Sequence, residues 1–212
     1  MSKGLFVVLE GIDGCGKSTQ ARLLEERLKQ ENKAALLTRE PGGTGAGEGI
    51  RNLLLSPESQ LCTCAEILLY AAARAQLVEE VIRPALEAGQ VVVCDRFVWS
   101  SLAYQGAGRG GDMDKIYQLN REVTQGVVPD LTVILDINEE EAQKRLGIKH
   151  ASEGDRDRLE KMDHSFYRRV RQKYLSFARE APSPVSVISS EGSPEDVHER
   201  IWLQVKEMLS NR

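Results

Sequence analysis

A glycine-rich segment near the amino terminus carries residue types that could bind a nucleotide. Residues 11–19 read GIDGCGKST and fit the phosphate-loop pattern G-x-x-x-x-G-K-[ST]. Glycines let such a loop bend tightly, so that several backbone N–H groups point at one anion. Lys17 could then reach the outer phosphates, and the Ser18 hydroxyl could bind Mg2+. We expect the Lys17 amine to face solvent while the loop is empty.

A second group of candidate side chains follows the apolar run 91–94. Asp95 comes directly after this run, at the place where P-loop proteins put a carboxylate that helps to hold Mg2+, often through water. Arg96 comes next and could grip a second anionic group. Residues 97–106 are dense in hydroxyls and aromatic rings, a composition suited to holding a polar ring system.

The elements that must position these residues follow from the apolar pattern. Apolar, often β-branched runs at 5–10, 34–38, 91–95, 131–135 and 185–189 alternate with helical patterns. Such alternation predicts repeated βα units and a parallel sheet with helices on both faces. Ligands bind at the carboxyl ends of the strands in these sheets, where most of the polar signatures lie. Among the expected helices are 64–88, a short one at 139–146, a long one opening at 156–158, and 195–209.

Bulk properties limit the class of protein. The chain has 212 residues, enough for a single α/β domain over residues 1–212, with 41% hydrophobic and 28% charged residues. A net charge of −4 argues against a general nucleic-acid binder. No apolar run is long enough for a signal peptide or a membrane span. Four cysteines without a CxxC pair suit a reducing cytoplasm, and we expect the chain to be cytoplasmic.

Three polar features have a plainer interpretation as well. Arg39 and Glu40 could face the ligand edge of the sheet, although the segment alone favours a surface salt pair. Tyr70 and Arg74 share one helix face, which by itself indicates only a helix surface. The basic stretch at about 147–158 is interpreted as a mobile lid, and the alternative is a solvated loop.

Several motifs together resemble thymidylate kinase. The match is carried by residues 10–19 (EGIDGCGKST), by residues 38–44 (TREPGGT), and by Asp95-Arg96-Phe97 continuing to residues 100–106 (SSLAYQG), and residues 157–160 (DRLE) support it. The first motif is shared by many nucleotide enzymes, whereas the second and third together are specific. The resemblance covers essentially the whole chain.

The resemblance implies a fold and an activity. The fold is a P-loop NTPase of the nucleoside-monophosphate-kinase type, with a five-stranded parallel sheet, working as a homodimer. The activity is transfer of the γ-phosphoryl group of ATP to dTMP, with Mg2+ as cofactor, giving dTDP and ADP for dTTP synthesis. The partners would therefore be small nucleotides, without nucleic acid or membrane.

The resemblance also implies roles for individual residues. ATP would be bound by Gly11, Ile12, Asp13, Gly14, Cys15, Gly16, Lys17, Ser18 and Thr19, with Arg145 and residues 190–193 near adenine. The acceptor dTMP would be bound by Asp13 at the 3′-hydroxyl, Tyr70 and Arg74 at thymine, Arg39 and Arg96 at the phosphate, and Ser101, Tyr104 and Gln105 around base and sugar. The metal would lie at Ser18 and Asp95, and catalysis would rest on Lys17, Arg96, Arg156 and Arg158.

Two positions differ within the family. The residue matched to base stacking is often phenylalanine in relatives and is Tyr70 here, whose hydroxyl needs a partner. One branch of the family carries an arginine in the phosphate loop, where this chain has Gly14. We therefore expect the lid to provide the catalytic arginine, either Arg156 or Arg158. Relatives often have a cis bond before the proline of the second motif, and we expect one at Glu40–Pro41.

Three other functions remain as alternatives. A small kinase for a different nucleotide or nucleoside would share the first motif but not the two specific segments. A GTPase-like switch would normally read guanine with N-K-x-D, a tetrapeptide that does not occur in this sequence. A non-catalytic nucleotide-binding module would not need Lys17, Ser18 and Asp95, all of which are present.

Overall fold

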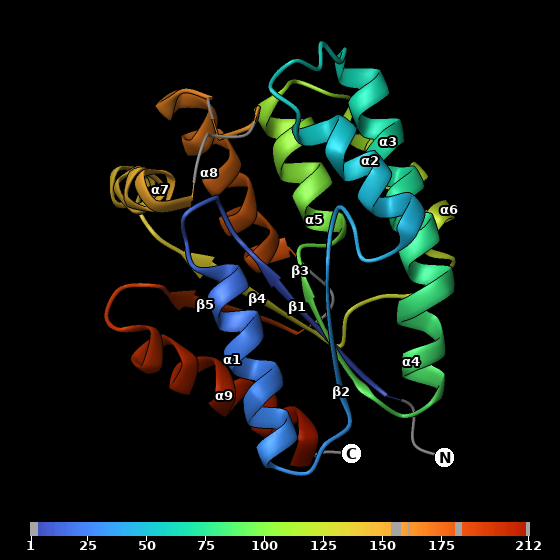
Figure 1. The fold of residues 1–212 in the computed structure, drawn as a ribbon, viewed down its shortest axis with the longest axis vertical. Coiled ribbons are helices and arrows are strands. Elements are labelled where there is room, and N and C mark those ends of the chain that lie inside the picture. The colour runs from blue at the N-terminus through green and yellow to red at the C-terminus, as the bar shows by residue number, and fades with distance from the viewer. Residues whose placement is uncertain (1–3, 154–157, 161, 181–183, 211–212) are drawn as a thin grey trace.

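One parallel sheet organises the molecule. The computed structural model describes residues 4–153, 158–160, 162–180 and 184–210. Its strands lie in the order β2-β3-β1-β4-β5 and are all parallel (Figure 1), which confirms the predicted five-stranded sheet. The strands are β1 (Leu5–Glu10), β2 (Ala35–Arg39), β3 (Val91–Asp95), β4 (Leu131–Asp136) and β5 (Val185–Ser189).

Helices connect successive strands, as parallel pairing requires. Two segments are π-helical. The first, η1 (Val78–Ile82), lies between α3 (Thr63–Leu77) and α4 (Arg83–Glu87), and the second, η2 (Leu102–Gly108), follows α5 (Val98–Ser101). The α-helices are α1 (Lys17–Gln30), α2 (Gly45–Leu55), α3 (Thr63–Leu77), α4 (Arg83–Glu87), α5 (Val98–Ser101), α6 (Met113–Thr124), α7 (Glu139–Glu153), α8 (His164–Glu180) and α9 (Pro194–Ser210).

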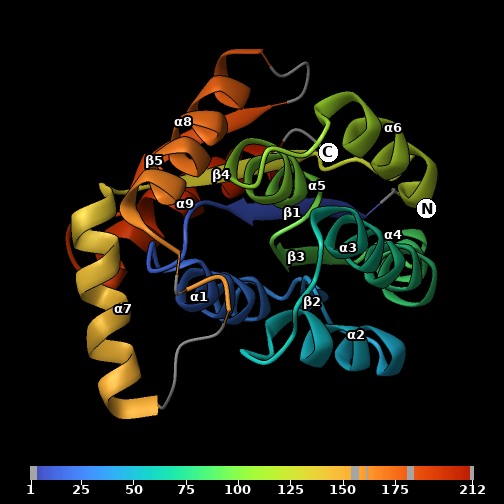
Figure 2. The ribbon, with the colours of Figure 1, turned by 90° about the horizontal axis from the view of Figure 1, so that it is seen from above.

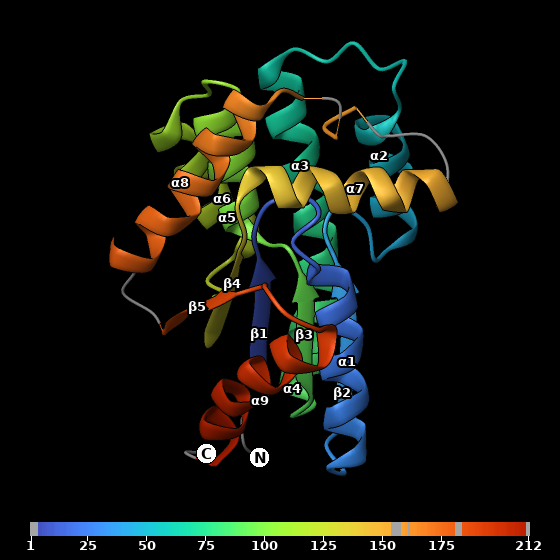
Figure 3. The same ribbon diagram turned by 90° about the vertical axis from the view of Figure 1, so that its left-hand side faces the viewer.

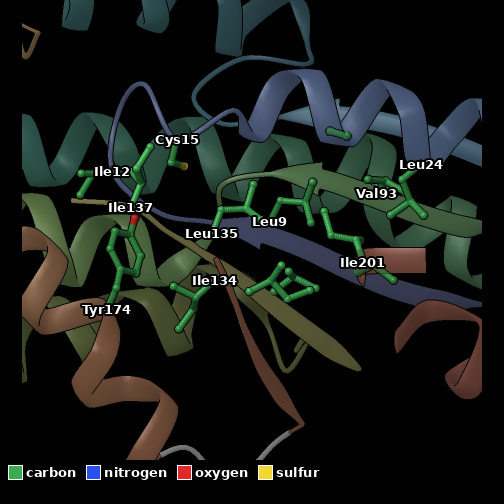
Figure 4. Close-up of a cluster of buried hydrophobic side chains, with 14 of the residues drawn as sticks. Leu9, Ile12, Cys15, Leu24, Val93, Ile134, Leu135, Ile137, Tyr174 and Ile201 are labelled. Atoms are coloured by element: carbon green, nitrogen blue, oxygen red, sulfur yellow. The ribbon is translucent and has the colours of Figure 1, made fainter. Parts of the chain in front are cut away.

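Both faces of the sheet are covered. In Figure 2, α1 lies on one side of β1, and α5 and α8 lie on the other. Alternate residues of β1 serve the two faces, because side chains alternate along a strand. Leu9 packs in a cluster with Leu24 of α1 and Ile201 of α9 (Figure 4), whereas Phe6 packs with η1 and α4.

The register of the sheet brings separate polar signatures to one edge. In the central strand, Leu9 pairs with Asp95 of β3 and with Val133 of β4. The residues that follow β1 and β3 therefore emerge side by side at the carboxyl end of the sheet. Figure 3 shows α7 lying across this end, above the start of α1.

Several predicted helix bounds need correction. The predicted helix 64–88 is present as α3, η1 and α4. The predicted end of the short helix near residue 146 is wrong, because α7 runs on to Glu153. Gly147 disfavours a helix, but it follows the buried Leu146 and precedes residues of ordinary helix propensity, so the helix continues through it. The next helix begins at His164, not at residues 156–158.

Two further expectations concern the backbone and the membrane. The peptide bond Glu40–Pro41 is cis, as predicted. Across the described residues, none of the helices combines the length and the apolar character that a membrane crossing needs.

Candidate active site

The segment 11–19 forms a tight loop between β1 and α1. Gly11, Gly14 and Gly16 have φ values of 142°, 82° and 95°, a region that side chains disfavour and glycine adopts freely. Helix α1 begins at Lys17, so the unpaired N–H groups of its first turn and its positive dipole end face the loop. This arrangement suits an anion, and phosphate binding there stays a prediction.

Helix α7 packs directly on this loop. A Cβ atom placed on Gly14 would lie 2.3 Å from the carbonyl oxygen of Ala142. Real side chains do not approach a backbone oxygen so closely, and the positive φ adds strain. The loop therefore has no room for an arginine at this position unless α7 moves.

Lys17 folds back over the loop. Its Nζ donates to the carbonyl oxygens of Gly11 at 3.0 Å and Ile12 at 2.9 Å, and its side chain is buried. The expectation that this amine faces solvent is wrong, because a buried ammonium needs acceptors and these carbonyls are the nearest ones. Burial raises the pKa of the neighbouring Cys15 thiol in spite of the Lys17 charge, so this cysteine is not activated.

Ser18 and Asp95 face one another across the sheet edge. Ser18 Oγ donates to Asp95 Oδ2 at 2.5 Å. The other oxygen, Oδ1, is buried, and no described residue donates a hydrogen bond to it. A buried carboxylate oxygen without a donor fits a cation or a water bound to one. The described residues contain no cluster of three acidic, histidine or cysteine side chains.

The guanidinium of Arg96 is fixed by several segments. Nη1 donates to the Gly11 carbonyl oxygen at 3.0 Å and to Ser100 Oγ at 3.1 Å. Nη2 donates to Asp13 Oδ1 at 2.5 Å, and the guanidinium lies 4.8 Å from the ring centre of Tyr104. The backbone of Arg96 has a φ of 75°, which is uncommon outside glycine and is often found at functional sites.

Asp13 is tied to the same group. Its backbone N–H donates to the Tyr104 hydroxyl at 3.0 Å, and this hydroxyl donates to Asp13 Oδ2 at 2.9 Å. Burial acts to raise the pKa of Asp13, but the charges of Arg96 and Lys17 outweigh it and hold the pKa below its ordinary value. Asp13 is therefore an anionic hydrogen-bond acceptor at the edge of the loop.

A buried carboxylate at the end of β1 supports Arg96 from behind. Glu10 accepts hydrogen bonds from the backbone N–H of Phe97 at 3.0 Å, from Ser100 Oγ at 2.7 Å and from the Tyr174 hydroxyl at 2.9 Å. Tyr174 reaches this network from α8 (Figure 4). Burial raises the pKa of Glu10, although these hydrogen bonds and the Arg96 charge oppose it. The sequence analysis did not identify Glu10 or Tyr174.

Two clefts meet at this network. The larger has a volume of about 870 Å³ and is lined by the phosphate loop, Arg39, Asp95 and Arg145. The smaller has a volume of about 80 Å³ and is lined by side chains that include Tyr70, Tyr104, Gln105 and Leu159. Both clefts share the residues Asp13, Glu40, Arg51 and Arg96. A ligand in one cleft would thus lie next to a ligand in the other.

Arg74 lies behind the smaller pocket. The lining of that pocket includes the predicted Tyr70, Tyr104 and Gln105, but among described residues it does not include Arg74 or Ser101. Arg74 is only 1% exposed. Its Nε donates to Glu40 Oε2 at 2.8 Å, and its Nη1 donates to Ser101 Oγ at 3.1 Å. A direct contact of Arg74 with a ligand stays a prediction.

The interpretation of Arg39 and Glu40 as a salt pair is wrong. Glu40 is buried against Arg74, whereas Arg39 pairs with Glu48 at 3.2 Å on the rim of the larger cleft. The two side chains point apart, Arg39 from the end of β2 and Glu40 from the bend that follows it. Burial raises the pKa of Glu40 to about 7, against the lowering effect of Arg74.

Arg51 was missed by the sequence analysis. It lies on α2, lines both clefts and donates from Nη1 to the Pro41 carbonyl oxygen at 2.8 Å. No helix was expected over residues 45–55, where three glycines lower the helix propensity. A signal was present in Thr44, whose Oγ1 accepts from the backbone N–H of Gly47 at 2.9 Å and caps the helix.

At the other end of the larger cleft, Arg145 meets the residues after β5. Its Nη2 donates to the Ser190 carbonyl oxygen at 3.1 Å, and both residues line the cleft. The structure thus brings together the two features that the resemblance places near adenine. Whether they contact a base stays a prediction.

The two lid arginines stand differently. Arg156 lies outside the described residues. Arg158 donates from Nη2 to Glu66 Oε2 at 2.7 Å and from Nε to the Leu54 carbonyl oxygen at 3.1 Å. Arg158 is thus seated on α2 and α3, and a contact with nucleotide phosphates would require it to leave Glu66. The predicted lid at 147–158 begins with the last residues of α7, and its mobility is untested.

The fold and the site define a class of protein: a P-loop protein with a second, smaller cleft beside the phosphate loop. A family model described as thymidylate kinase matches residues 9–201. The thymidylate kinase of Deinococcus radiodurans is 46% identical over 208 residues, which cover 98% of each chain. The thymidylate kinase of a Synechococcus species is 51% identical, covering 97% of this chain and 96% of the relative.

A solved structure gives the same result. The crystal structure of thymidylate kinase from Ehrlichia chaffeensis superposes with a TM-score of 0.78 at 34% sequence identity, covering 96% of this chain and 99% of that one. The chain belongs to the thymidylate kinase family.

Proposed function

We propose that this chain transfers the γ-phosphoryl group of ATP to dTMP and forms dTDP and ADP for dTTP synthesis. The observation that carries the proposal is the junction of the two clefts at Asp13 and Arg96. A donor held by the phosphate loop and an acceptor held in the smaller pocket would meet there, as a direct transfer between two nucleotides requires.

ATP would occupy the larger cleft, with its phosphates on the loop. Lys17 would leave the Gly11 and Ile12 carbonyls for the outer phosphates, which are stronger acceptors for an ammonium. Ser18 and Asp95 would hold Mg2+, which neutralises phosphate charge when it is bound. Arg145 would lie near the adenine ring.

The acceptor would occupy the smaller pocket. Arg96 would align its phosphate, with Arg39 at the rim, and Asp13 would accept a hydrogen bond from the 3′-hydroxyl. Tyr70 would stack on the thymine ring, and Tyr104 and Gln105 would line its edge and the sugar. The acceptor phosphate is already an anion, so the transfer needs positioning and charge neutralisation, not a general base.

The remaining positive charge would come from the lid. Gly14 gives the loop no arginine, and its contact with Ala142 leaves no space for one. Because Arg158 is seated on Glu66, Arg156 is the better candidate for the arginine that reaches the transferred group. Closure of this segment would also exclude water from the reacting phosphates.

A cytoplasmic homodimer is part of the proposal. Leu53, Leu68 and Tyr117 are large apolar side chains that are about half exposed, at 47%, 54% and 53%. They lie on α2, α3 and α6, which pack side by side and would form one contact surface. Light scattering of the purified protein would give a mass of twice 23.6 kDa, and a monomer at all concentrations would contradict this part.

The decisive experiment is ADP formation measured with dTMP, dUMP, dCMP, UMP and AMP as acceptors. We expect the highest kcat/KM for dTMP. A higher value for another acceptor would favour a different nucleotide kinase. ADP formation with no dependence on any acceptor would indicate an ATPase or a switch protein instead.

A further inference from the structure

A buried carboxylate joins the lid to the wall of the smaller pocket. Glu66 of α3 is fully buried. Its Oε1 accepts a hydrogen bond from Gln105 Nε2 at 2.8 Å, and its Oε2 accepts one from Arg158 Nη2 at 2.7 Å. Arg109 Nη2 lies 3.7 Å from the same Oε2. Glu66 does not line either cleft, so any effect on a ligand must pass through its partners.

The partners of Glu66 decide which way the Gln105 amide points. A carboxylate flanked by two arginines is an acceptor only, so it must face the NH2 group of Gln105 and not the amide oxygen. Gln105 is 1% exposed and lines the smaller pocket, and no described residue donates to its Oε1. The amide oxygen is therefore the group that Gln105 can offer to a ligand.

We propose that Glu66 is a positioning residue that makes the smaller pocket select a pyrimidine with a ring N–H. Thymine and uracil carry a hydrogen on N3, whereas cytosine has a bare ring nitrogen there. A fixed amide oxygen accepts from the first kind of ring and repels the second. The inference deepens the proposed function and rests on it, because it needs a thymine nucleotide in this pocket.

The same carboxylate couples this selection to the segment after the lid. Arg158 occupies one oxygen of Glu66 while Gln105 occupies the other. Next to Arg158, Leu159 lines the pocket, and its carbonyl oxygen accepts from the Tyr167 hydroxyl at 3.2 Å. The position of residues 158–159 and the orientation of the Gln105 amide are therefore coupled through the hydrogen bonds of Glu66.

Replacement of the Glu66 carboxylate by an amide should reverse the orientation of the Gln105 amide. In Glu66→Gln, the new amide oxygen would turn to Arg158 and Arg109, which can only donate. The NH2 group of the new glutamine would then face Gln105. The amide oxygen of Gln105 would have to turn toward it and accept a hydrogen bond. The Gln105 NH2 group would point into the pocket, where it suits the bare ring nitrogen of cytosine.

The experiment compares dTMP with 5-methyl-dCMP, which keeps the methyl group and changes the ring edge. For Glu66→Gln we expect the ratio of kcat/KM, dTMP over 5-methyl-dCMP, to fall by at least about tenfold, with a rise in the absolute value for 5-methyl-dCMP. A merely structural role would lower both values together and leave the ratio unchanged. An unchanged ratio overturns the proposal.

A matched control and a second variant complete the test. Glu79→Gln makes the same change on an exposed residue further along the same helical stretch and should leave the ratio as it is. In Gln105→Leu the ratio should already be low, and adding Glu66→Gln should not lower it further. If Glu66→Gln does not fold, Gln105→Leu alone decides, and a wild-type ratio in that variant overturns the inference.

The proposed function and this inference can fail separately. If the unmodified protein does not phosphorylate dTMP, the proposed function fails. If it does so and Glu66→Gln keeps the unmodified preference, only the role of Glu66 fails.

Discussion

The hydroxyl of Tyr104 is bonded twice to Asp13, accepting from its backbone N–H at 3.0 Å and donating to its carboxylate at 2.9 Å. The guanidinium of Arg96 also lies over the ring of Tyr104, in a cation–π contact. One side chain thus holds both the expected 3′-hydroxyl acceptor and the expected phosphate ligand. Its position is fixed by contacts that do not depend on the ligand.

A rigid ring beneath the sugar should exclude a 2′-hydroxyl. We expect dTMP to be preferred over its ribonucleotide counterpart, because the extra hydroxyl would clash with Tyr104 or lie unpaired. Tyr104→Ala should reduce this preference about tenfold, and Tyr104→Phe, which keeps the ring, should retain it. The measurement is kcat/KM for both sugars. Equal values in the unmodified enzyme would contradict the assignment.

Lys17→Ala should remove activity and leave the fold intact. Loss of a cation that is expected to contact the transferred phosphates should lower kcat at least ~100-fold. The two hydrogen bonds to the Gly11 and Ile12 carbonyls are also lost, so Tm should drop by only a few degrees. Lys29→Ala, on the exposed side of the same helix, is the control for kcat. Near-normal turnover in Lys17→Ala would refute the phosphate-loop assignment.

Asp95→Asn should raise the Mg2+ requirement. The amide keeps the shape of the side chain and removes the charge from the oxygen that no described residue satisfies. We expect the Mg2+ concentration for half-maximal activity to rise ~10–100-fold, with little change in Tm. Asp114→Asn changes an exposed aspartate and serves as control. A Mg2+ titration that matches the unmodified enzyme would exclude Asp95 from the metal site.

The two lid arginines should divide the kinetic effects. Arg156→Ala should lower kcat at least ~100-fold with a small change in KM for dTMP, as expected for a group that acts on the transition state. Arg158→Ala should chiefly raise KM for dTMP, about tenfold. The substitution removes the donor to Glu66 Oε2, so the Glu66 carboxylate that orients the Gln105 amide is held less firmly. Arg168→Ala, exposed on α8, is the control. A double variant with more than about a tenth of normal kcat would mean that this segment is only a solvated loop.

Glu40 should make stability depend on pH. Burial raises its pKa to about 7, from an ordinary value of 4.5 in the unfolded chain. Between these values the folded protein holds a proton that the unfolded chain releases, so this group's contribution to the free energy of unfolding falls as pH rises from about 4.5 to about 7. Glu40→Gln should flatten that fall by roughly 1 kcal/mol per pH unit. Denaturant unfolding at several pH values checks this, and parallel curves for both proteins would contradict it.

The parts of the fold that were predictable have local signatures. Continuous apolar runs identified the strands within one or two residues, because buried parallel strands tolerate few polar side chains. The phosphate loop and Asp95 follow strand ends, and parallel strands bring such ends to one edge of the sheet. The site around Ser18 could therefore be assembled before any contact was known.

The parts that were not predictable depend on contacts between distant segments. Glu10 looked like the end of a strand, and only the approach of α8 makes it a support for Arg96. Arg158 belongs to a basic stretch, and its pairing with Glu66, 92 residues away, has no sequence signal. The inward position of Lys17 follows from carbonyls that the bent loop exposes.

The close approach of Gly14 to Ala142 also constrains how such a protein can evolve. With α7 in its present position, an arginine in place of Gly14 would strike the backbone of α7, so this substitution requires the helix to move. The residue at position 14 of the loop and the path of α7 are therefore coupled. A chimera that receives only an arginine-bearing phosphate loop should therefore be destabilised by the clash with α7. A chimera that also receives residues 139–158 from the same donor protein should avoid this clash.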